Sequence, residues 1–127
     1  MSAASARSQA VTLRAGQIVW LYLDAAAGHE QKGRRPALVV SNSLFNEMSS
    51  TVMVCPITSS LRPFPLNVPL DGRTKTQGAV LCAQIRAFDL SVRAHKVVEA
   101  VPADILARCH EVIAAALGAE TPDTGEE

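Results

Sequence analysis

The sequence predicts a mainly β fold, a small antiparallel barrel with a single helix packed on it. The first observation is a series of short apolar runs between residues 17 and 100, rich in β-branched residues and separated by turn residues. The second is one helical pattern that follows them, between Pro102 and Gly118. The third is the size of the chain: 127 residues, 48% apolar and 19% charged, suit one globular domain.

The two ends of the chain differ in composition from this body. Residues 1–12 are rich in Ala, Ser and Gln, and residues 119–127 carry four acidic residues and no basic one. Segments of this kind bury too little apolar surface to order themselves. We therefore expect a disordered leader at 1–12, a domain at 13–118 and a disordered acidic tail at 119–127.

Six runs are expected to be strands, at residues 17–23, 37–41, 51–57, 66–70, 78–87 and 96–100. Residues 42–48 are expected to form a short helical turn. Pro56, near the end of the third run, indicates an edge strand or a bulge because proline cannot donate to a ladder. Trp20 lies inside the first apolar run, which favours a core position over a base-stacking role.

The longest of these runs, 78–87, alternates along its length. The purely apolar set, expected to face the core, is Ala79, Leu81, Ala83 and Ile85. The opposite set ends in Gln84 and Arg86, which are expected to face solvent. An amide and a guanidinium on one exposed face suit base edges and phosphates, although an ordinary polar strand end would look the same.

The helical pattern begins at Pro102, which suits the first position of a helix, and Asp104 is favourable in the first turn. Gly118 suits the residue just past the end. The predicted buried stripe consists of Ile105, Cys109, Val112 and Ala116, widened by Leu106, Ile113 and Leu117.

The formal net charge is zero, but the charges are unevenly distributed. Residues 31–96 contain nine basic and three acidic residues, a net charge of +6, whereas residues 119–127 carry −4. A basic body favours a polyanionic or acidic partner because the local field steers association. Nine of the twelve basic residues are arginine, whose guanidinium binds two phosphate oxygens at once.

The cysteines and the hydropathy indicate a cytoplasmic protein. Cys55, Cys82 and Cys109 are odd in number and lack CxxC spacing, which argues against a disulfide framework and a zinc cluster and suits a reducing compartment. The longest uncharged run, residues 48–61, is fourteen residues long and rich in Ser and Thr, too short and polar for a membrane span. Residues 1–12 contain no continuous apolar block and are not expected to be a secretory signal. Cys55 and Cys82 are expected to be sheet residues rather than nucleophiles.

Three short segments carry the groups suited to chemistry. The first is a loop with two glycines and five ionisable side chains, G-x-E-Q-x-G-x-R-P, from Gly28 to Pro36. The second is P-x-T-S from Pro56 to Ser59, which leaves a strand as a run of hydroxyls. The third is the run from Gly78 to Arg86. Taken alone, each segment also fits an ordinary structural role: a polar hairpin loop, a strand-end cap or an exposed polar strand end.

Together, in this order and spacing, the three segments resemble the MazF/PemK family of toxin endoribonucleases, over about residues 13–118. The resemblance implies an SH3-like antiparallel β-barrel of the MazF/PemK/CcdB type with a C-terminal helix packed on it, and a homodimer. It implies cleavage of single-stranded mRNA at short preferred sequences with no metal or other cofactor. It also implies inhibition by an acidic antitoxin protein of the MazE type. By similarity, the catalytic residues fall on Arg35, Thr58 and Glu30.

The chemistry explains why these residue types suffice. The 2′-OH of RNA attacks the neighbouring phosphate, so the substrate supplies the nucleophile and the products are a 2′,3′-cyclic phosphate and a 5′-OH. Arg35, whose pKa exceeds about 12, is expected to stabilise the phosphorane, and Thr58 to donate a hydrogen bond to the same phosphate. Glu30 is the candidate base; His29, which titrates near pH 6.5, is the second. The expected RNA-binding residues are His29, Gln31, Lys32, Ser59, Ser60, Arg62, Gln84 and Arg86.

Two other functions remain open at this point. Toxins with the same barrel can inhibit DNA gyrase without catalysis, and fold alone does not decide between the two. Arg35 and Thr58 favour the nuclease, because a gyrase inhibitor has no need of them. A plain adaptor for nucleic acid or peptide is the third hypothesis.

Overall fold

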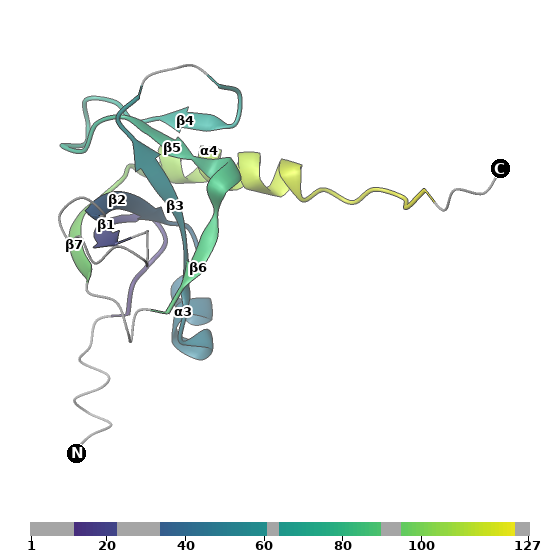
Figure 1. Ribbon diagram of the computed structural model, residues 1–127, viewed down its shortest axis with the longest axis horizontal. Helices are drawn as coiled ribbons and strands as arrows, with labels where there is room; N and C mark the ends of the chain where they lie inside the picture. Colours follow the sequence, from purple (N-terminus) through teal and green to yellow (C-terminus); the bar gives the residue numbers. More distant parts are fainter. Residues whose placement is uncertain (1–11, 23–33, 61–63, 90–94, 124–127) are drawn as a thin grey trace, which may run out of the picture.

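The fold is a bent antiparallel sheet crossed by one long helix. The computed structural model describes residues 12–22, 34–60, 64–89 and 95–123 (Figure 1). The strands are β1 (Gln17–Tyr22), β2 (Arg34–Val39), β3 (Val52–Thr58), β4 (Asn67–Pro69), β5 (Ala79–Leu81), β6 (Arg86–Phe88) and β7 (His95–Ala100). The helices are α3 (Ser43–Ser49), the 3-10 turn η1 (Cys82–Gln84) and α4 (Ala103–Ala116). No helix in the described ranges is long and apolar enough to cross a bilayer.

The strands pair in the order β4-β5-β3-β2-β1-β7, and β6 pairs with β3 beside β5. All the pairs are antiparallel. The predicted mainly β fold with a C-terminal helix is therefore confirmed. The word barrel applies loosely, because the described strands form a path whose two ends, β4 and β7, do not pair.

The three central strands are buried on both faces, and their period-2 alternation feeds two cores. One core, under α4, takes Ile18, Leu38 and Ile57. The other, on the opposite face of the same strands, takes Val19 and Val39 together with Val54 of β3 and Phe88 of β6. Where both faces are buried, the strands form continuous apolar runs in the sequence, whereas the end of β2 at Arg34 and Arg35 is exposed.

The strand predicted at 78–87 is wrong: the chain breaks into β5, η1 and β6. β5 pairs with Ile57 and Thr58, whereas β6 pairs with residues 52–54 of β3. The break lies opposite Cys55 and Pro56, and Pro56 has no N–H to donate to a ladder. Pro56 thus marks an interruption in the pairing of a central strand, and the expected edge position is incorrect.

The 3-10 turn also overturns the side chains expected on each face of that run. Val80 and Cys82 are buried, whereas Ala83, predicted to face the core, is exposed. η1 rotates the chain between the two short strands, so one alternation cannot extend through it. Gln84 and Arg86 remain exposed, as expected.

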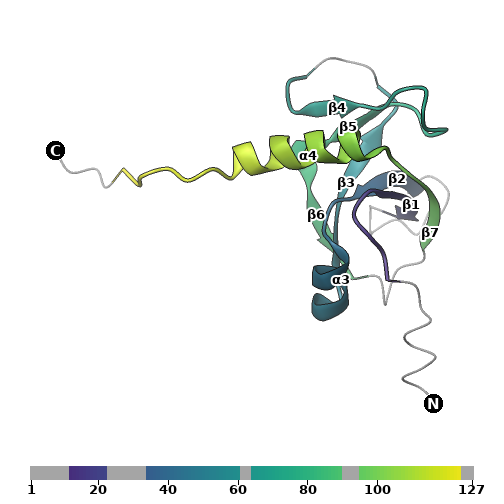
Figure 2. The same ribbon diagram turned by 180° about the vertical axis from the view of Figure 1, so that it is seen from behind.

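Helix α4 follows Pro102, which precedes the first helical residue rather than occupying it. Ile105, Cys109 and Val112 are buried against the sheet, which confirms that part of the predicted stripe. Leu117, predicted to be buried, is 77% exposed. The last turn of α4 projects beyond the strands (Figures 1 and 2), and Ala116, also predicted to be buried, is exposed there. Residues 119–123 continue in the same direction without regular structure.

The short helix α3 confirms the predicted turn at 42–48. The side chain of its N-cap, Asn42, accepts a hydrogen bond from the backbone N–H of Phe45 at 2.8 Å, as such caps do. Asn46 donates to the carbonyl of Leu13 at 2.7 Å. This bond ties the helix to the chain segment that leads into β1. The division of the ends into leader and tail stays a prediction, since residues 1–11 and 124–127 lie outside the described ranges.

Candidate active site

The register of β2 and β3 brings two of the motif residues together. Ala37 is paired with Pro56, and Leu38 with Cys55. Continuing this register by two residues, within the bounds of both strands, sets Arg35 opposite Thr58. Directly opposed residues in an antiparallel pair project to the same face with their Cβ atoms about 4.5–5.5 Å apart. A guanidinium and a hydroxyl from distant parts of the sequence therefore share one position at the end of the sheet.

Thr58 is held in place at the end of β3 by its surroundings. Its Oγ1 accepts a hydrogen bond from the backbone N–H of Ser60 at 3.0 Å, which leaves the hydroxyl proton free to be donated. Gly78 adopts a φ of +124°, and a Cβ at this position would lie 2.0 Å from the carbonyl oxygen of Thr58. Only glycine fits there, which explains physically why the third motif begins with this residue.

A cleft of about 440 Å³ lies beside Thr58. Ser60 and Gln84 also line it, together with the half-exposed ring of Phe64. Gln84 belongs to η1, so the break in the predicted strand is what places its amide beside Thr58. With Asn67, which also lines it, the cleft combines two hydroxyls, two amides and an aromatic ring beside Thr58.

Arg86 lies on the same side of β3. It is paired with Val54, which has the same face as Thr58 along the strand, and its guanidinium lies 5.1 Å from the centre of the Phe88 ring. Among the described residues, the ion pairs are formed by Arg73 and Arg108, not by Arg35 or Arg86. Both of the latter are exposed, so their charges are available to a phosphate.

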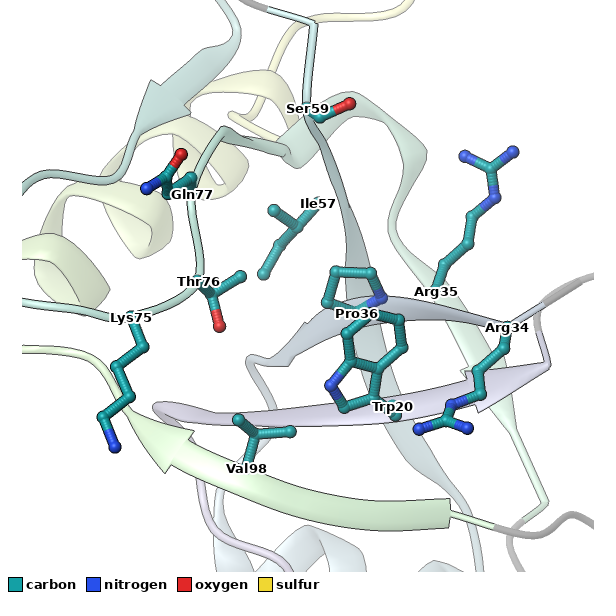
Figure 3. Close-up of a pocket in the computed structure, with 10 residues that line it drawn as sticks. All are labelled: Trp20, Arg34, Arg35, Pro36, Ile57, Ser59, Lys75, Thr76, Gln77 and Val98. Carbon is teal, nitrogen blue, oxygen red and sulfur yellow. The ribbon is translucent and has the colours of Figure 1, made fainter. Parts of the chain in front are cut away.

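A second and larger pocket, of about 640 Å³, lies at the same strand ends, beside Trp20. Arg34, Arg35 and Ser59 all line it, so this pocket reaches one of the two predicted catalytic side chains. Arg34 places its guanidinium 5.0 Å from the centre of the Trp20 ring, while Arg35 points away from that ring (Figure 3). Trp20, expected in the core, is only partly buried and forms a wall of this pocket.

The far wall of this pocket is anchored by one carboxylate. Glu99 of β7 accepts hydrogen bonds from the backbone N–H groups of Lys75 and Thr76, at 3.0 and 2.8 Å, and from the Thr76 hydroxyl at 2.7 Å. Desolvation raises the pKa of Glu99, but these hydrogen bonds outweigh it and hold the pKa below its usual range. The charged form of Glu99 therefore fixes the loop that carries Thr76 and Gln77.

The comparisons with known proteins decide the family. A family model described as the PemK-like, MazF-like toxin of type II toxin-antitoxin systems matches residues 14–117. This chain belongs to that family. It is 40% identical to the endoribonuclease PemK of Escherichia coli over 95 residues, 72% of this chain and 71% of the relative.

Solved structures agree with this assignment. The toxin has a TM-score of 0.75 to the crystal structure of MazF from Deinococcus radiodurans, with 36% identity, covering 86% of this chain and 99% of the other. Its TM-score to a MazE–MazF structure from the same organism is 0.77, with 33% identity over 87% of this chain and 100% of the other. The resemblance found in the three motifs is thus confirmed.

The structure separates the predicted site residues of the toxin into three groups. Thr58, Ser60 and Gln84 line the 440 Å³ cleft, and Arg86 lies on β6, which pairs with β3. Arg35 and Ser59 line the 640 Å³ pocket beside Trp20. The remaining predicted residues, His29, Glu30, Gln31, Lys32 and Arg62, lie outside the described ranges.

One of the basic residues that made the body of the toxin positive is already neutralised. Arg73 forms ion pairs with Asp71 at 2.8 Å and with Asp104 at 2.9 Å, which join the turn after β4 to the start of α4. Its hydrogen bonds hold the pKa of both carboxyls below the usual range. Arg73 is therefore a structural residue rather than part of a free cationic surface.

The three cysteines are buried and none forms a disulfide. Hydrogen bonding to Cys82 and burial raise the pKa of Cys55 and Cys109, so these thiols stay protonated, as a core role requires. Within the part of the chain that the structure describes, no group of three or more His, Cys, Asp and Glu residues could hold a metal ion.

Sequence reasoning missed Trp20 and Glu99 as pocket residues. An aromatic residue inside an apolar run looks like core, and a single glutamate in a weak strand carries no motif. The only signal for Glu99 was its position as the sole acidic residue in the run 95–100.

Proposed function

We propose that this toxin cleaves single-stranded mRNA by the attack of its 2′-OH on the adjacent phosphate. The observation that carries the proposal is the register that sets Arg35 opposite Thr58, next to a cleft with hydrogen-bonding groups. Its similarity to relatives named as endoribonucleases supports the same reaction.

The reaction forms a bond between O2′ and phosphorus and breaks the bond between phosphorus and O5′. The proton of the 2′-OH passes to Glu30, or to His29 as the second candidate, and the departing 5′ oxygen takes up a proton from water to give the 5′-OH. Arg35 stabilises the charge on the phosphorane, which is worth roughly 10²–10³ in rate for one well-placed donor. The Thr58 hydroxyl donates a hydrogen bond to the same phosphate, while its oxygen accepts a hydrogen bond from the backbone N–H of Ser60.

The groups around this centre hold the RNA strand. Arg86 contacts a flanking phosphate, and Gln84 and Ser60 are placed to meet base or sugar groups in the cleft. Lys32, Gln31 and Arg62 are proposed to add further contacts. The chain has few aromatic residues, 4% in all, so charge supplies most of the affinity, and binding weakens as salt is raised.

The toxin is inhibited by an acidic antitoxin of the MazE type. A cationic surface that accepts the phosphates of RNA also accepts the carboxylates of a peptide. Solved MazE–MazF structures, which this chain resembles closely, support this partner. We place the toxin in the cytoplasm, which its mRNA substrate and its three unbridged cysteines support.

We also propose a homodimer. Leu117 at the end of α4, and Leu44 and Met48 on one face of α3, are 77%, 65% and 76% exposed in the single chain. Large apolar side chains this exposed support burial against another copy. Light scattering on the purified toxin tests this: a mass of one chain, with no change at higher concentration, would refute the dimer.

The reaction is tested by incubating the toxin with a long single-stranded RNA in EDTA and mapping the ends. Discrete cuts with cyclic phosphates are expected, and Arg35→Ala and Thr58→Ala should abolish them while melting at the wild-type temperature. Thr58→Ser, which keeps the hydroxyl, is the matched control and should still cut. Intact RNA together with inhibited gyrase would instead identify a non-catalytic toxin, a function that the named relatives do not support.

A further inference from the structure

Three thiols from distant parts of the chain meet in the core under α4. Cys55 belongs to β3, Cys82 to η1 and Cys109 to α4, and all three pack in the same apolar cluster. η1 contacts both β3 and α4, and the thiol of Cys82 shares hydrogen bonds with those of Cys109 and Cys55. Cys82 therefore lies between the other two thiols, close enough to either for a bond between sulfur atoms.

The three thiols are not equivalent. Hydrogen bonds from Cys109 and Cys55 hold the pKa of Cys82 below its usual range, and the positive charge of Arg108 acts in the same direction. The same hydrogen bonds, together with burial, raise the pKa of Cys55 and of Cys109. The thiolate therefore forms on Cys82, with a protonated thiol on either side. A cysteine of low pKa beside a second thiol is the arrangement found at oxidation-sensitive sites.

Cys82 is also the thiol that a small oxidant can reach. It lies in a three-residue turn whose next two residues, Ala83 and Gln84, are exposed and line the 440 Å³ cleft. The described ladder pairs stop at Leu81 and resume at Arg86, so η1 opens locally more readily than the strands beside it. Hydrogen peroxide, which is hardly larger than water, passes through such an opening.

Cys109 is the better placed of the two neighbouring thiols to bond with Cys82. Cys55 is fixed within a central strand, where it is paired with Leu38 of β2. α4 meets the sheet through its side chains, such as Ile105 and Val112, so a small shift of this helix brings the sulfur of Cys109 to that of Cys82.

We propose that Cys82 and Cys109 form a reversible disulfide when the toxin meets a small peroxide, and that this bond lowers the activity of the RNA cleft. The effect on RNA rests on the proposed endoribonuclease function, whereas the formation of the disulfide does not. In reducing compartments, the disulfides that form are usually transient and redox-sensing.

The oxidation proceeds in two steps. The thiolate of Cys82 attacks one oxygen of hydrogen peroxide, the O–O bond breaks, and a sulfenic acid forms while the departing hydroxide takes up a proton from solvent. The sulfur of Cys109 then attacks the sulfur of Cys82. An S–S bond forms, the S–O bond breaks, and the second hydroxide leaves as water with the thiol proton of Cys109. Two thiols thus lose two electrons in total, and one peroxide is reduced to two waters.

The disulfide changes one wall of the cleft beside Thr58. An S–S bond is about 2.05 Å long, shorter than the contact between two hydrogen-bonded thiols, so η1 is drawn toward α4. Leu81, Ala83 and Gln84, the residues on either side of Cys82, line the cleft and move with it. A misplacement of about 1 Å can cost 10²-fold in rate, so kcat/KM of the oxidised toxin should fall by about 10- to 100-fold.

Peptide mapping tests the disulfide in the unaltered protein. The reduced toxin is treated with hydrogen peroxide, its remaining thiols are alkylated in denaturant, and it is digested with trypsin. Cleavage after Arg73 and Arg108 places the three cysteines on three different peptides. The peptide of Cys82 should be linked to that of Cys109, with Cys55 alkylated. Alkylated Cys82, a link from Cys82 to Cys55, or a link between two chains on a non-reducing gel would overturn the proposal.

Variants connect the disulfide to activity. The cleavage rate of each protein after peroxide is divided by its own rate before treatment, so a basal loss in a core variant cancels. Cys109→Ala should lose the response to peroxide. Cys55→Ala, which truncates an equally buried thiol beside Cys82, is the matched control and should keep it. A simple thiol reductant should restore the wild-type rate, whereas oxidised methionine requires a dedicated reductase. An equal response of Cys109→Ala and wild type, or a loss that the reductant does not reverse, would overturn the regulation.

The outcomes distinguish this site from the function it regulates. If the reduced toxin cuts RNA and the toxin with the mapped disulfide cuts it equally well, the regulation is refuted and the proposed function stands. If the reduced toxin does not cut RNA at all, the proposed function fails, and the peptide map still decides whether the disulfide forms.

Discussion

Two arrangements at the ends of β2 and β3 are built in different ways. Arg35 and Thr58 come from the ends of two neighbouring strands, and the register of those strands, continued by two residues, sets them opposite each other. Trp20 is enclosed by a loop that a carboxylate of β7 anchors. The first arrangement depends on local register, and the second on contacts between distant segments. Substitutions that disturb the first arrangement should therefore change kcat, and substitutions that disturb the second should change KM.

The largest effect is expected from Gly78→Ala, which displaces the backbone at Thr58. The added Cβ would meet the Thr58 carbonyl at 2.0 Å with φ at +124°, so the end of β3 must shift and Thr58 with it. A misplacement of about 1 Å can cost 10²-fold in rate, so kcat should fall by at least that much. Gly72→Ala, which meets no atom within 4 Å, is the control. Both are compared in single-turnover cleavage and in thermal melting; wild-type kcat for Gly78→Ala would contradict the role of this contact.

A smaller effect is expected from Arg86→Ala. Removing one phosphate contact should raise KM several-fold and reduce the dependence of log affinity on log salt by about 0.7 for a single strand. Arg108→Ala, which removes an exposed arginine paired with Glu111 on α4, should leave both unchanged. Titrations at several salt concentrations measure the slopes, and equal slopes for Arg86→Ala and wild type would remove Arg86 from the RNA surface.

Glu99→Gln should loosen the loop at Lys75 and Thr76, which lines the Trp20 pocket with Arg35, and leave the strands that carry Arg35 and Thr58 intact. We expect a KM raised by a few-fold with kcat unchanged, the opposite pattern to Gly78→Ala. A fall in kcat at unchanged KM would show that the two arrangements are not separable.

The smallest effect in this series is the loss, at low pH, of the hydrogen bonds that the Glu99 carboxylate accepts. Hydrogen bonds lower the folded-state pKa of Glu99, so its contribution is complete above the ordinary glutamate pKa of about 4.3. It is lost as the pH falls through the lower, folded value. Trp20 fluorescence of the free toxin should therefore change below about pH 4 in the wild type, and this step should be absent in Glu99→Gln. A step of equal size in both proteins would assign it to another group.

The difference between the two arrangements also explains what the sequence could predict. The apolar runs predicted most strands, because strands buried on both faces leave long apolar signals. Arg35 and Thr58 were found because each lies in a short contiguous motif. The break at η1 was missed because it depends on β3 pairing with two successive strands.

The Trp20 pocket was not readable from the sequence for the same kind of reason. Its walls meet through hydrogen bonds between Glu99 and the loop at Lys75 and Thr76, far apart in the chain, and a run of apolar residues does not reveal which aromatic ring borders a cavity. The exposed end of α4 was missed because helical periodicity does not show where the sheet beneath it stops. Leu117 continues the stripe in the sequence but is exposed in the structure.

The central claim is that Arg35 and Thr58 act on one phosphate, and a double-mutant cycle tests it most directly. Arg35→Ala, Thr58→Val and the double variant are compared with wild type in single-turnover cleavage of one RNA in EDTA. Groups that act as a unit give strongly non-additive losses, so the double variant should be little slower than the worse single variant. Losses that multiply independently, or a single variant that cuts at the wild-type rate, would contradict the claim.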